Sequence, residues 1–393
     1  IVTGSVTASP DGAGLVSTFI QGNDTITPAG TYYRVCIFYN GAKFRCDYYS
    51  ITLASFDLNS ATPISTAPVV TPPTGDTTYL RVDAGNTNLT TTYSFLFGRL
   101  NGIRFASRYA TGGAGTSVSP WTGWETVYTG ITANSAIYFP PGYYSTNGVI
   151  FSGSTFSVSN VMIFGAGPSS IIRLQASATQ QDGILVLKDI NDIVIKDLIL
   201  DGNQANQGTN VHFGIYAVGV TRLDVEGVTF QNFNWDGATA GGDGLYVGGT
   251  ATNLSSYDLK VSRANFIQCE RNGISLVNSL ERFSIEHSSF NLSHSNGNGG
   301  IDIEPNSTTR WARFGSIAHN SFFGTAAATS SAYAIIFEGA ATNFITDIQV
   351  TDNSFENLQS ATHAAVLVRN ASRIGINHNS FRSLTAGTAA VKV

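Results

Sequence analysis

The chain has little charge and no long apolar run. Asp, Glu, Lys and Arg make up only 12% of its 393 residues, against roughly a quarter in an ordinary soluble domain. Its 21 basic and 26 acidic side chains give a formal net charge of −5, so there is no basic footprint for nucleic acid. No apolar run approaches the roughly 18 residues of a membrane span. We therefore expect neither a nucleic-acid partner nor a membrane span.

Cysteine is also scarce, with three in the whole chain. No Cys/His spacing indicates a zinc site, and we expect no metal and no cofactor. Cys36 and Cys46 flank Asn40-Gly41, which is a hairpin-turn signal. If the loop holds three residues, these two cysteines face each other and a disulfide is expected. Cys269 has no obvious partner and is expected to be a small buried residue.

Small polar residues take the place of the missing charges. The chain has 41 glycines and many Ser, Thr and Asn, while hydrophobic residues still reach 42%, so it is not a disordered chain. This composition is typical of a large β structure with many tight turns, and it favours an extracellular place: secreted, cell-surface or virion. Because the chain opens at Ile1 without a signal peptide, we expect a leader or upstream part to have been removed.

The first third is predicted to form an N-terminal antiparallel β module. Residues 1–68 alternate short strand-like runs with turns, as in a small sandwich. Residues 69–115 are predicted to be a linker and a further β segment, and whether this region binds a ligand or only caps and spaces is left open. A short amphipathic helix that seals the end of the following structure is predicted from the spacing of Trp121, Trp124, Val127, Tyr128 and Ile131.

From about residue 148 onward two patterns alternate. A glycine or alanine leads an apolar strand about every 25 to 35 residues, a period that signals a solenoid. A second strand between these leads ends in an aromatic residue. The leading residues are Gly148, Gly183, Gly214, Gly244, Gly273, Gly300, Ala334, Ala365 and Ala390. The closing phenylalanines are Phe230, Phe266, Phe290, Phe322, Phe355 and Phe381.

These repeats predict stacked coils. A single coil of short strands cannot bury its apolar face, whereas stacked coils bury like residues in continuous columns. The six phenylalanines are expected to form one such column. The predicted fold is all-β: a right-handed parallel β-helix of about eight coils, over residues 116–393, that follows the N-terminal module.

Three stretches of this region resemble the β-helices of the pectate-lyase superfamily, with pectate-lyase-3-like and phage-tailspike-like proteins among them. They are Ile137–Tyr144, Val161–Gly167 with the following Ile171–Leu174, and Ile193–Asn203. The resemblance covers about residues 116–393 and implies the fold. The superfamily contains polysaccharide lyases, glycoside hydrolases, epimerases, tailspike depolymerases and non-enzymatic adhesins, so the resemblance implies a polysaccharide partner.

The sequence departs from the catalytic motifs of that superfamily. The Asn-Thr-Asp, Asp-Asp and Gly-His-Gly motifs of polygalacturonases are missing, and so is the Asp-Pro-His-Glu signature of mannuronan epimerases. The arginine-centred pattern of classical pectate lyases is not evident either. No catalytic residue is therefore carried over by motif, and candidates must come from the repeat itself.

Alignment of the strands on their leading residue predicts two outward-facing columns. Outward carboxylates gather in neighbouring coils, and two tyrosines lie two to three coils below them. The second positions after the lead are Leu185, Tyr216, Tyr246, Ser275, Asp302, Ile336 and Leu367. The fourth positions are Leu187, Val218, Gly248, Val277, Glu304, Glu338 and Arg369.

Asp302, Glu304 and Glu338 are the predicted catalytic residues. On one strand Asp302 and Glu304 are roughly 6.5 to 7 Å apart, and Glu304 and Glu338 on neighbouring strands are about 4.8 Å apart. Retaining glycosidases need carboxyl groups about 5 to 5.5 Å apart and inverting ones about 6.5 to 9.5 Å. Like charges this close raise one pKa, which suits a general acid. The predicted substrate-binding residues are Tyr216, Tyr246, Trp235, Asp243, Arg369 and His212.

Structural roles for the same residues remain open. Glu338 can simply pair with Arg369 one coil on, and Asp302 can bind a turn amide. Asp201 and Asp236 are further acidic candidates, and His294 and His363 lie near turns. A lyase would want a base and a cation near a uronate, for which the helpers would be Lys188, Arg271 and Arg369.

Two functions of different class follow. The first is an extracellular carbohydrate-active protein that binds and cleaves a polysaccharide, as a hydrolase with a carboxylate pair or, second, as a lyase. The alternative is a non-enzymatic structural or adhesive subunit, such as a surface filament or tail fibre. It is motivated by the core-type strand at Ala389–Val393, which would leave a solenoid end open to a homo-oligomeric partner, as a trimer or end to end.

Overall fold

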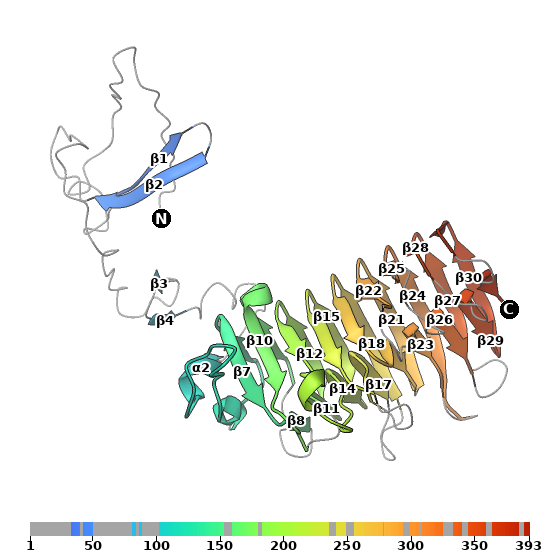
Figure 1. Cartoon of the computed structure of the whole chain (residues 1–393), viewed down its shortest axis with the longest axis horizontal. Coiled ribbons are helices and arrows are strands. Elements are labelled where there is room, and N and C mark those ends of the chain that lie inside the picture. The colour runs from blue at the N-terminus through green and yellow to red at the C-terminus, as the bar shows by residue number, and fades with distance from the viewer. Residues whose placement is uncertain are drawn as a thin grey trace, which may run out of the picture. The chain divides into compact units, whose positions relative to one another are not determined.

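The computed structural model describes two parts of the chain (Figure 1). In the first 96 residues it describes 33–39, 42–49, 81–83 and 86–88. In the second unit, which spans Phe97–Val393, it describes 102–393 apart from a set of short gaps. The gaps are 130, 153–158, 180–182, 236–240, 249–254, 278, 294–298, 306–308, 325–332, 340–344, 359–363 and 385–388.

The first unit contains two antiparallel strand pairs. One joins β1 (Tyr33–Tyr39) to β2 (Ala42–Tyr49), and the other joins β3 (Arg81–Asp83) to β4 (Asn86–Asn88). The predicted strands on either side of Asn40-Gly41 are therefore present. The sandwich-like module as a whole, and its boundary at residue 68, lie largely outside the described residues and stay predictions.

The register of β1 and β2 sets Cys36 directly opposite Cys46. Cysteines on directly paired positions of an antiparallel hairpin are close enough at their Cα atoms for a disulfide. We expect non-reduced, denatured protein to be lighter by two hydrogens than reduced protein in intact-mass spectrometry. The Cys36→Ser variant should lose this difference. Two alkylatable thiols at these positions in protein purified without reductant would contradict the prediction.

The second unit is a parallel β-helix made of three sheets (Figure 1). Each level of the stack contributes one strand to each sheet, and all strands within a sheet are parallel to their neighbours. The β8–β32 sheet comprises β8 (Val149–Ser152), β11 (Leu185–Lys188), β14 (Ile215–Val218), β17 (Leu245–Gly248), β20 (Asn272–Leu276), β23 (Gly299–Ile303), β26 (Tyr333–Glu338), β29 (Ala364–Arg369) and β32 (Ala389–Lys392).

The other two sheets complete each level. The β7–β31 sheet comprises β7 (Gly142–Thr146), β10 (Ser170–Leu174), β13 (Ile199–Asp201), β16 (Thr229–Phe233), β19 (Asn265–Cys269), β22 (Ser289–Asn291), β25 (Ser321–Phe323), β28 (Ser354–Glu356) and β31 (Ser380–Arg382). The β5–β30 sheet comprises β5 (Gly102–Phe105), β6 (Ser135–Phe139), β9 (Val161–Gly165), β12 (Asn191–Lys196), β15 (Thr221–Glu226), β18 (Ser255–Ser262), β21 (Ser279–Glu286), β24 (Ala312–Ala318), β27 (Ile345–Thr351) and β30 (Ala371–Asn377).

Nine levels correspond to eight full turns between the first and last strand of a sheet, so the predicted all-β solenoid of about eight coils is confirmed. Strand order does not distinguish the hand of the coil, and the right-handed coil stays a prediction. β5 pairs with β6, so the β-helix sheet begins at Gly102. This strand lies inside the 69–115 segment that the sequence assigned to a linker and further β structure.

Two short helices close the first level. They are α2 (Ala106–Tyr109) and the 3₁₀ helix η1 (Trp124–Tyr128). Trp124 and Val127 are buried, and the Trp124 ring packs edge-on against Phe139 and Tyr144. The predicted amphipathic segment is therefore present as a single 3₁₀ turn that covers the core. Two further 3₁₀ turns, η2 (Gly167–Ser169) and η3 (Gln204–Asn206), lie between strands.

The leading glycines and the closing phenylalanines form one packing unit. Phe266, Phe290 and their column neighbours stack with ring centroids 4.6 to 5.0 Å apart and almost parallel. A Cβ on Gly273 would lie 2.7 Å from Phe290 Cδ1, and one on Gly244 would lie 2.7 Å from Phe266 Cδ1. At these levels the ring therefore occupies the space that a side chain on the leading glycine would need. The predicted phenylalanine column is confirmed.

A second column stabilises the turn between the β5–β30 and β7–β31 sheets. Asn353 is buried, and its Nδ2 donates to Ile317 O (2.9 Å) and to Asn379 Oδ1 (3.0 Å). Its Oδ1 accepts the backbone N–H of Asn320 at 2.9 Å. Each amide thus pairs buried backbone groups of neighbouring levels, which holds the turns in register.

The helices of the structure bear on the prediction that the chain has no membrane span. Among the described residues, no helix is long and apolar enough to cross a membrane.

Candidate functional site

The outer face of the β8–β32 sheet carries the predicted columns, with one correction. Tyr216 pairs with Tyr246, Tyr246 with Ser275, and Ser275 with Asp302. At β11, however, the residue in this column is Val186, and the second column holds Lys188. The alignment on Gly183 was therefore wrong by one residue, and Leu185 and Leu187 face the core, where both are buried.

Asp302 and Glu304 lie on the same outer face at the end of β23. Asp302 is half-buried between the buried residues Ile301 and Ile303. Burial raises the pKa of Asp302 to about 7, the charges of Glu304 and Asp243 add to this, and Arg271 opposes it. Burial also raises the pKa of Glu304, and the charge of Glu338 adds to the effect. Asp302 therefore titrates close to neutral pH, beside a second carboxyl group whose pKa is also raised.

Glu338 differs from this pair. It follows Phe337, which pairs with Ile303, so it occupies the position next to Glu304 on β26. Its carboxylate accepts a hydrogen bond from Arg369 Nη1 at 2.9 Å, and both side chains are well exposed, at 38% and 48%. The simple ion-pair alternative for Glu338 and Arg369 is thus present in the structure. The charge of Glu338 acts on its neighbour Glu304, whose pKa it helps to raise.

Tyr216 and Tyr246 form a stacked aromatic platform on the same face. Their ring centroids are 5.0 Å apart with an interplanar angle of 11°, and Phe213 packs against both rings. The Lys188 ammonium lies 5.6 Å from the Tyr216 ring centroid. Burial raises the pKa of Tyr246 to about 12, so its hydroxyl stays a neutral donor. The platform begins two levels below Asp302, about 10 Å along the stack.

A polar network lies between the platform and the carboxylates. Asp243 is completely buried and binds Arg271 through Nε (2.9 Å) and Nη2 (2.5 Å). Burial works to lower the pKa of Arg271, but the charge and hydrogen bonds of Asp243 outweigh it and raise this pKa. The backbone N–H of Asn272 donates to Asp243 Oδ1 at 3.0 Å, and its side-chain Nδ2 donates to Asp302 Oδ2 at 3.1 Å. A buried ion pair is thereby linked to the half-buried carboxyl.

The remaining predicted binding residues lie off the exposed face. Asp243 and His212 are 0% and 2% exposed, so neither is placed to contact a glycan directly. Trp235 is half-buried in the turn after β16, where its backbone N–H donates to Glu270 Oε2 at 2.8 Å. Asp201 is buried and bound to Arg173. The further candidates outside the described residues are Asp236, His294 and His363.

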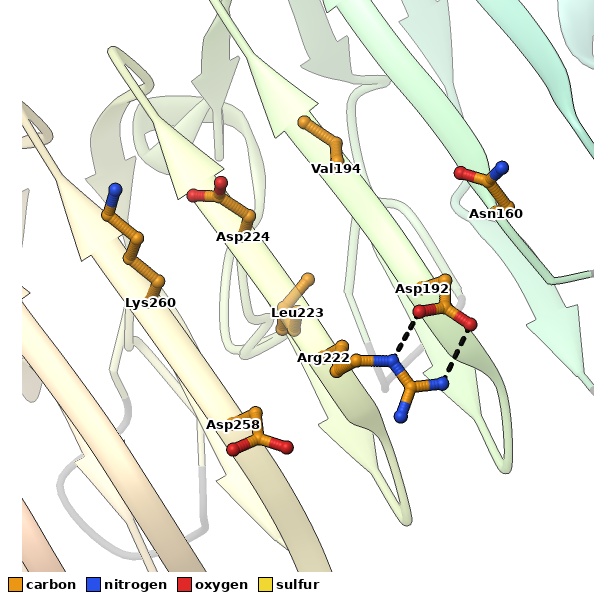
Figure 2. A pocket seen from close by; sticks show the side chains of 8 residues that line it. All are labelled: Asn160, Asp192, Val194, Arg222, Leu223, Asp224, Asp258 and Lys260. Carbon is orange, nitrogen blue, oxygen red and sulfur yellow. Dashed lines mark hydrogen bonds and ion pairs between the residues drawn. The ribbon is translucent and has the colours of Figure 1, made fainter. Parts of the chain in front are cut away.

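A shallow hollow of about 230 Å³ lies on a different sheet, over β12, β15 and β18 and beside Asn160, which precedes β9 (Figure 2). Two of its three carboxylates are paired with arginines: Arg222 binds Asp192, and Arg282 binds Asp258. Burial raises the pKa of the third, Asp224. The hydrogen bond from each arginine lowers the pKa of its partner. These two carboxylates stay ionised at neutral pH and offer no proton. Figure 2 shows Asp224 and Lys260 beside each other on adjacent strands.

Several residues of the site were not singled out as binding or catalytic from the sequence. Asn272 is one of them, and Arg271 was considered only as a cationic helper for a lyase. Arg310 also belongs here, because its positive charge acts to lower the pKa of Tyr246. A usable signal exists in the repeat, since Asp243 and Asn272 each directly precede a leading glycine. No group of three or more metal-ligating side chains occurs in the described residues.

No protein-family model matches the chain, and no curated protein matches it. Among solved structures, it resembles the Agl-KA catalytic domain at 14% identity and TM-score 0.41, over 73% of this chain and 58% of that one. It resembles an alginate lyase from Paenibacillus at 12% identity and TM-score 0.45, over 75% of this chain and 100% of that one. It resembles a family 28 exopolygalacturonase from Yersinia enterocolitica at 10% identity and TM-score 0.37, over 74% of this chain and 77% of that one.

The matching structures are mostly enzymes that act on carbohydrates, together with an adhesin and a virus protein. At these identities the likeness concerns the fold alone. The parallel β-helix that the sequence resemblance implied is confirmed by the three stacked parallel sheets, while the roles of individual residues must be argued from this chain.

Proposed function

We propose that this protein binds a polysaccharide along the outer face of the β8–β32 sheet and hydrolyses a glycosidic bond with Asp302 and Glu304. The observation that carries the proposal is the half-buried Asp302 with its pKa of about 7, two residues before Glu304 on the same outer face. A carboxyl group that keeps its proton at neutral pH, beside a second carboxylate, is the pair that glycoside hydrolysis requires.

The two roles follow from the surroundings of each group. Asp302 has the more strongly raised pKa and acts as the acid: its O–H bond breaks as the proton moves to the leaving oxygen, which also takes the electron pair of the glycosidic bond. Glu304 removes a proton from a water molecule whose oxygen bonds to the anomeric carbon. Their Cα atoms are about 6.5 to 7 Å apart along the strand. We infer an inverting reaction, because carboxyl groups that keep this spacing leave room for that water.

The stacked tyrosines supply binding without chemistry. Aromatic faces are suited to the apolar faces of sugar rings, and Tyr216 and Tyr246 lie on the same face as Asp302, two to three levels away. A chain that contacts both the platform and the carboxylates must run along the stack of coils. We propose an extracellular setting for this reaction, since low charge and abundant small polar residues favour it.

Separate substitutions of the two glutamates test the assignment. The protein should release reducing ends from a polysaccharide in a panel of neutral and acidic glycans, and Glu304→Gln should lower the rate about 10²–10⁴-fold, the range for loss of a general base. Glu338→Gln should lower it less than tenfold, because Glu338 is paired with Arg369. Products that absorb as unsaturated sugars would show a lyase instead. Full activity of Glu304→Gln would refute the assignment.

A further inference from the structure

Asn272 binds Asp302 in a way that specifies where the acid keeps its proton. Asn272 is the first residue of β20 and is 2% exposed. Its side-chain nitrogen donates one hydrogen bond to Ser275 Oγ at 2.9 Å and one to Asp302 Oδ2 at 3.1 Å. An amide NH₂ group is only a donor. Asp302 Oδ2 must therefore act as an acceptor in this contact, whether the carboxyl group is ionised or protonated.

The position of Asn272 is fixed from both sides. Its backbone N–H donates to the buried Asp243, which is itself clamped on Arg271. On the other side, Asn272 pairs with Gly299 of β23, and the lack of a side chain on Gly299 leaves room for the Asn272 amide. A Cβ on Gly299 would lie 3.3 Å from Asn272 Oδ1, which is tighter than an ordinary contact. The amide therefore reaches across Gly299 to the neighbouring strand and meets Asp302.

We propose that Asn272 is a positioning residue that holds the protonated Asp302 with its hydrogen on Oδ1, the oxygen that the amide does not bind. This assignment rests on the proposed role of Asp302 as the acid. The amide donor on Oδ2 favours that oxygen as the carbonyl acceptor, so the transferable proton is placed on Oδ1. The proton then leaves Oδ1 for the glycosidic oxygen, and the carboxylate that remains keeps the hydrogen bond from Asn272 on Oδ2. The amide thus stabilises the product form of the acid.

The same contact has a measurable consequence for titration. A donor to a carboxyl group favours its ionised form, so Asn272 opposes the effect of burial on Asp302. Removal of the donor should move the titration midpoint of Asp302 to higher pH. We expect a shift of about one pH unit, in the range that a hydrogen bond to a charged group supports. A purely structural asparagine would not change this midpoint.

The test uses carboxyl ¹³C NMR of the full chain, with Asp302→Asn identifying the Asp302 signal. Asn272→Ala should move the Asp302 midpoint upward by about one unit and move the alkaline limit of cleavage in the same direction. Asn353→Ala is the matched control, because Asn353 is an equally buried asparagine on another turn. It should leave the midpoint unchanged. Should Asn272→Ala fail to fold, Asn272→Ser serves, since its hydroxyl is too short to reach Asp302.

An unchanged Asp302 midpoint in both Asn272 variants would overturn the assignment, and so would an equal shift in Asn353→Ala. Absence of cleavage by the wild-type protein on every glycan would overturn the proposed function. That result would leave the hydrogen-bond assignment standing or falling on the NMR titration alone, which needs no substrate.

Discussion

Asp302→Asn should strongly slow cleavage while it makes the folded protein more stable above neutral pH. An asparagine cannot donate a carboxyl proton, so we expect the rate to fall roughly 10³-fold, within the range for a lost general acid. The fold should persist, because asparagine has nearly the same size and its Oδ1 can still accept the hydrogen bond from Asn272. Rates of reducing-end release from pH 4 to 9 measure the first effect.

The stability effect follows from the sign of the pKa shift. The pKa of Asp302 rises from 3.8 to about 7 on folding, so between these values the folded state binds more protons than the unfolded state. The free energy of unfolding of the wild type therefore falls as pH rises from about 4 to 7. Asp302→Asn lacks this loss and should be more stable at pH 8 by on the order of 2 kcal/mol, after allowance for partial solvation.

Asp347→Asn is the matched control for this prediction. Asp347 lies on the outer face of a different sheet and binds Arg373 at 2.6 Å, which lowers its pKa. Its neutralisation should leave cleavage unchanged and should not stabilise the protein at pH 8. Chemical denaturation at pH 5 and pH 8 measures both variants. A gain in stability for Asp302→Asn that is equal at the two pH values would contradict the buried-acid explanation.

Phe290→Ala should destabilise the β-helix by about 3 to 5 kcal/mol, the usual cost of removing a fully buried phenylalanine ring. Phe290 has no exposed surface and stacks between Phe266 and Phe322 at 4.6 Å from each. The ring also fills the space above Gly273. Each level of a solenoid contacts only its neighbours, so a cavity in the middle of the stack weakens contacts on both sides.

Phe314→Ala is the control for this substitution. Phe314 is 51% exposed on the outer face, and its removal should change stability by less than about 0.5 kcal/mol. Urea unfolding followed by far-ultraviolet circular dichroism compares the two variants. Gly273→Val tests the other half of the contact, because its Cβ would meet Phe290 Cδ1 at 2.7 Å and Gly300 O at 2.8 Å. Equal stability of Phe290→Ala and Phe314→Ala would contradict the role of the column.

The sequence by itself determined the β-helix and most of its outer columns. The reason is local: a parallel stack repeats one contact at every level, so the leading glycine and the closing phenylalanine must recur along the chain. The positions of Asp302 and Glu304 followed from the same repeat, because alternate residues of a strand face opposite sides. The one-residue error at Gly183 arose because Leu185 pairs with Ile215. Ile184, and not Gly183, therefore occupies the position that Gly214 holds one level on.

Only the tertiary structure decided which neighbours each outward residue meets. The network from Asp243 through Arg271 and Asn272 to Asp302 joins three consecutive levels, through residues about 30 positions apart in the chain. Its residues lie where strands begin. The directions of their side chains depend on turn geometry and on the room that the missing side chain of Gly299 leaves. A repeat predicts which residues form a column, but burial and the hydrogen bonds between levels determine which carboxyl group keeps its proton.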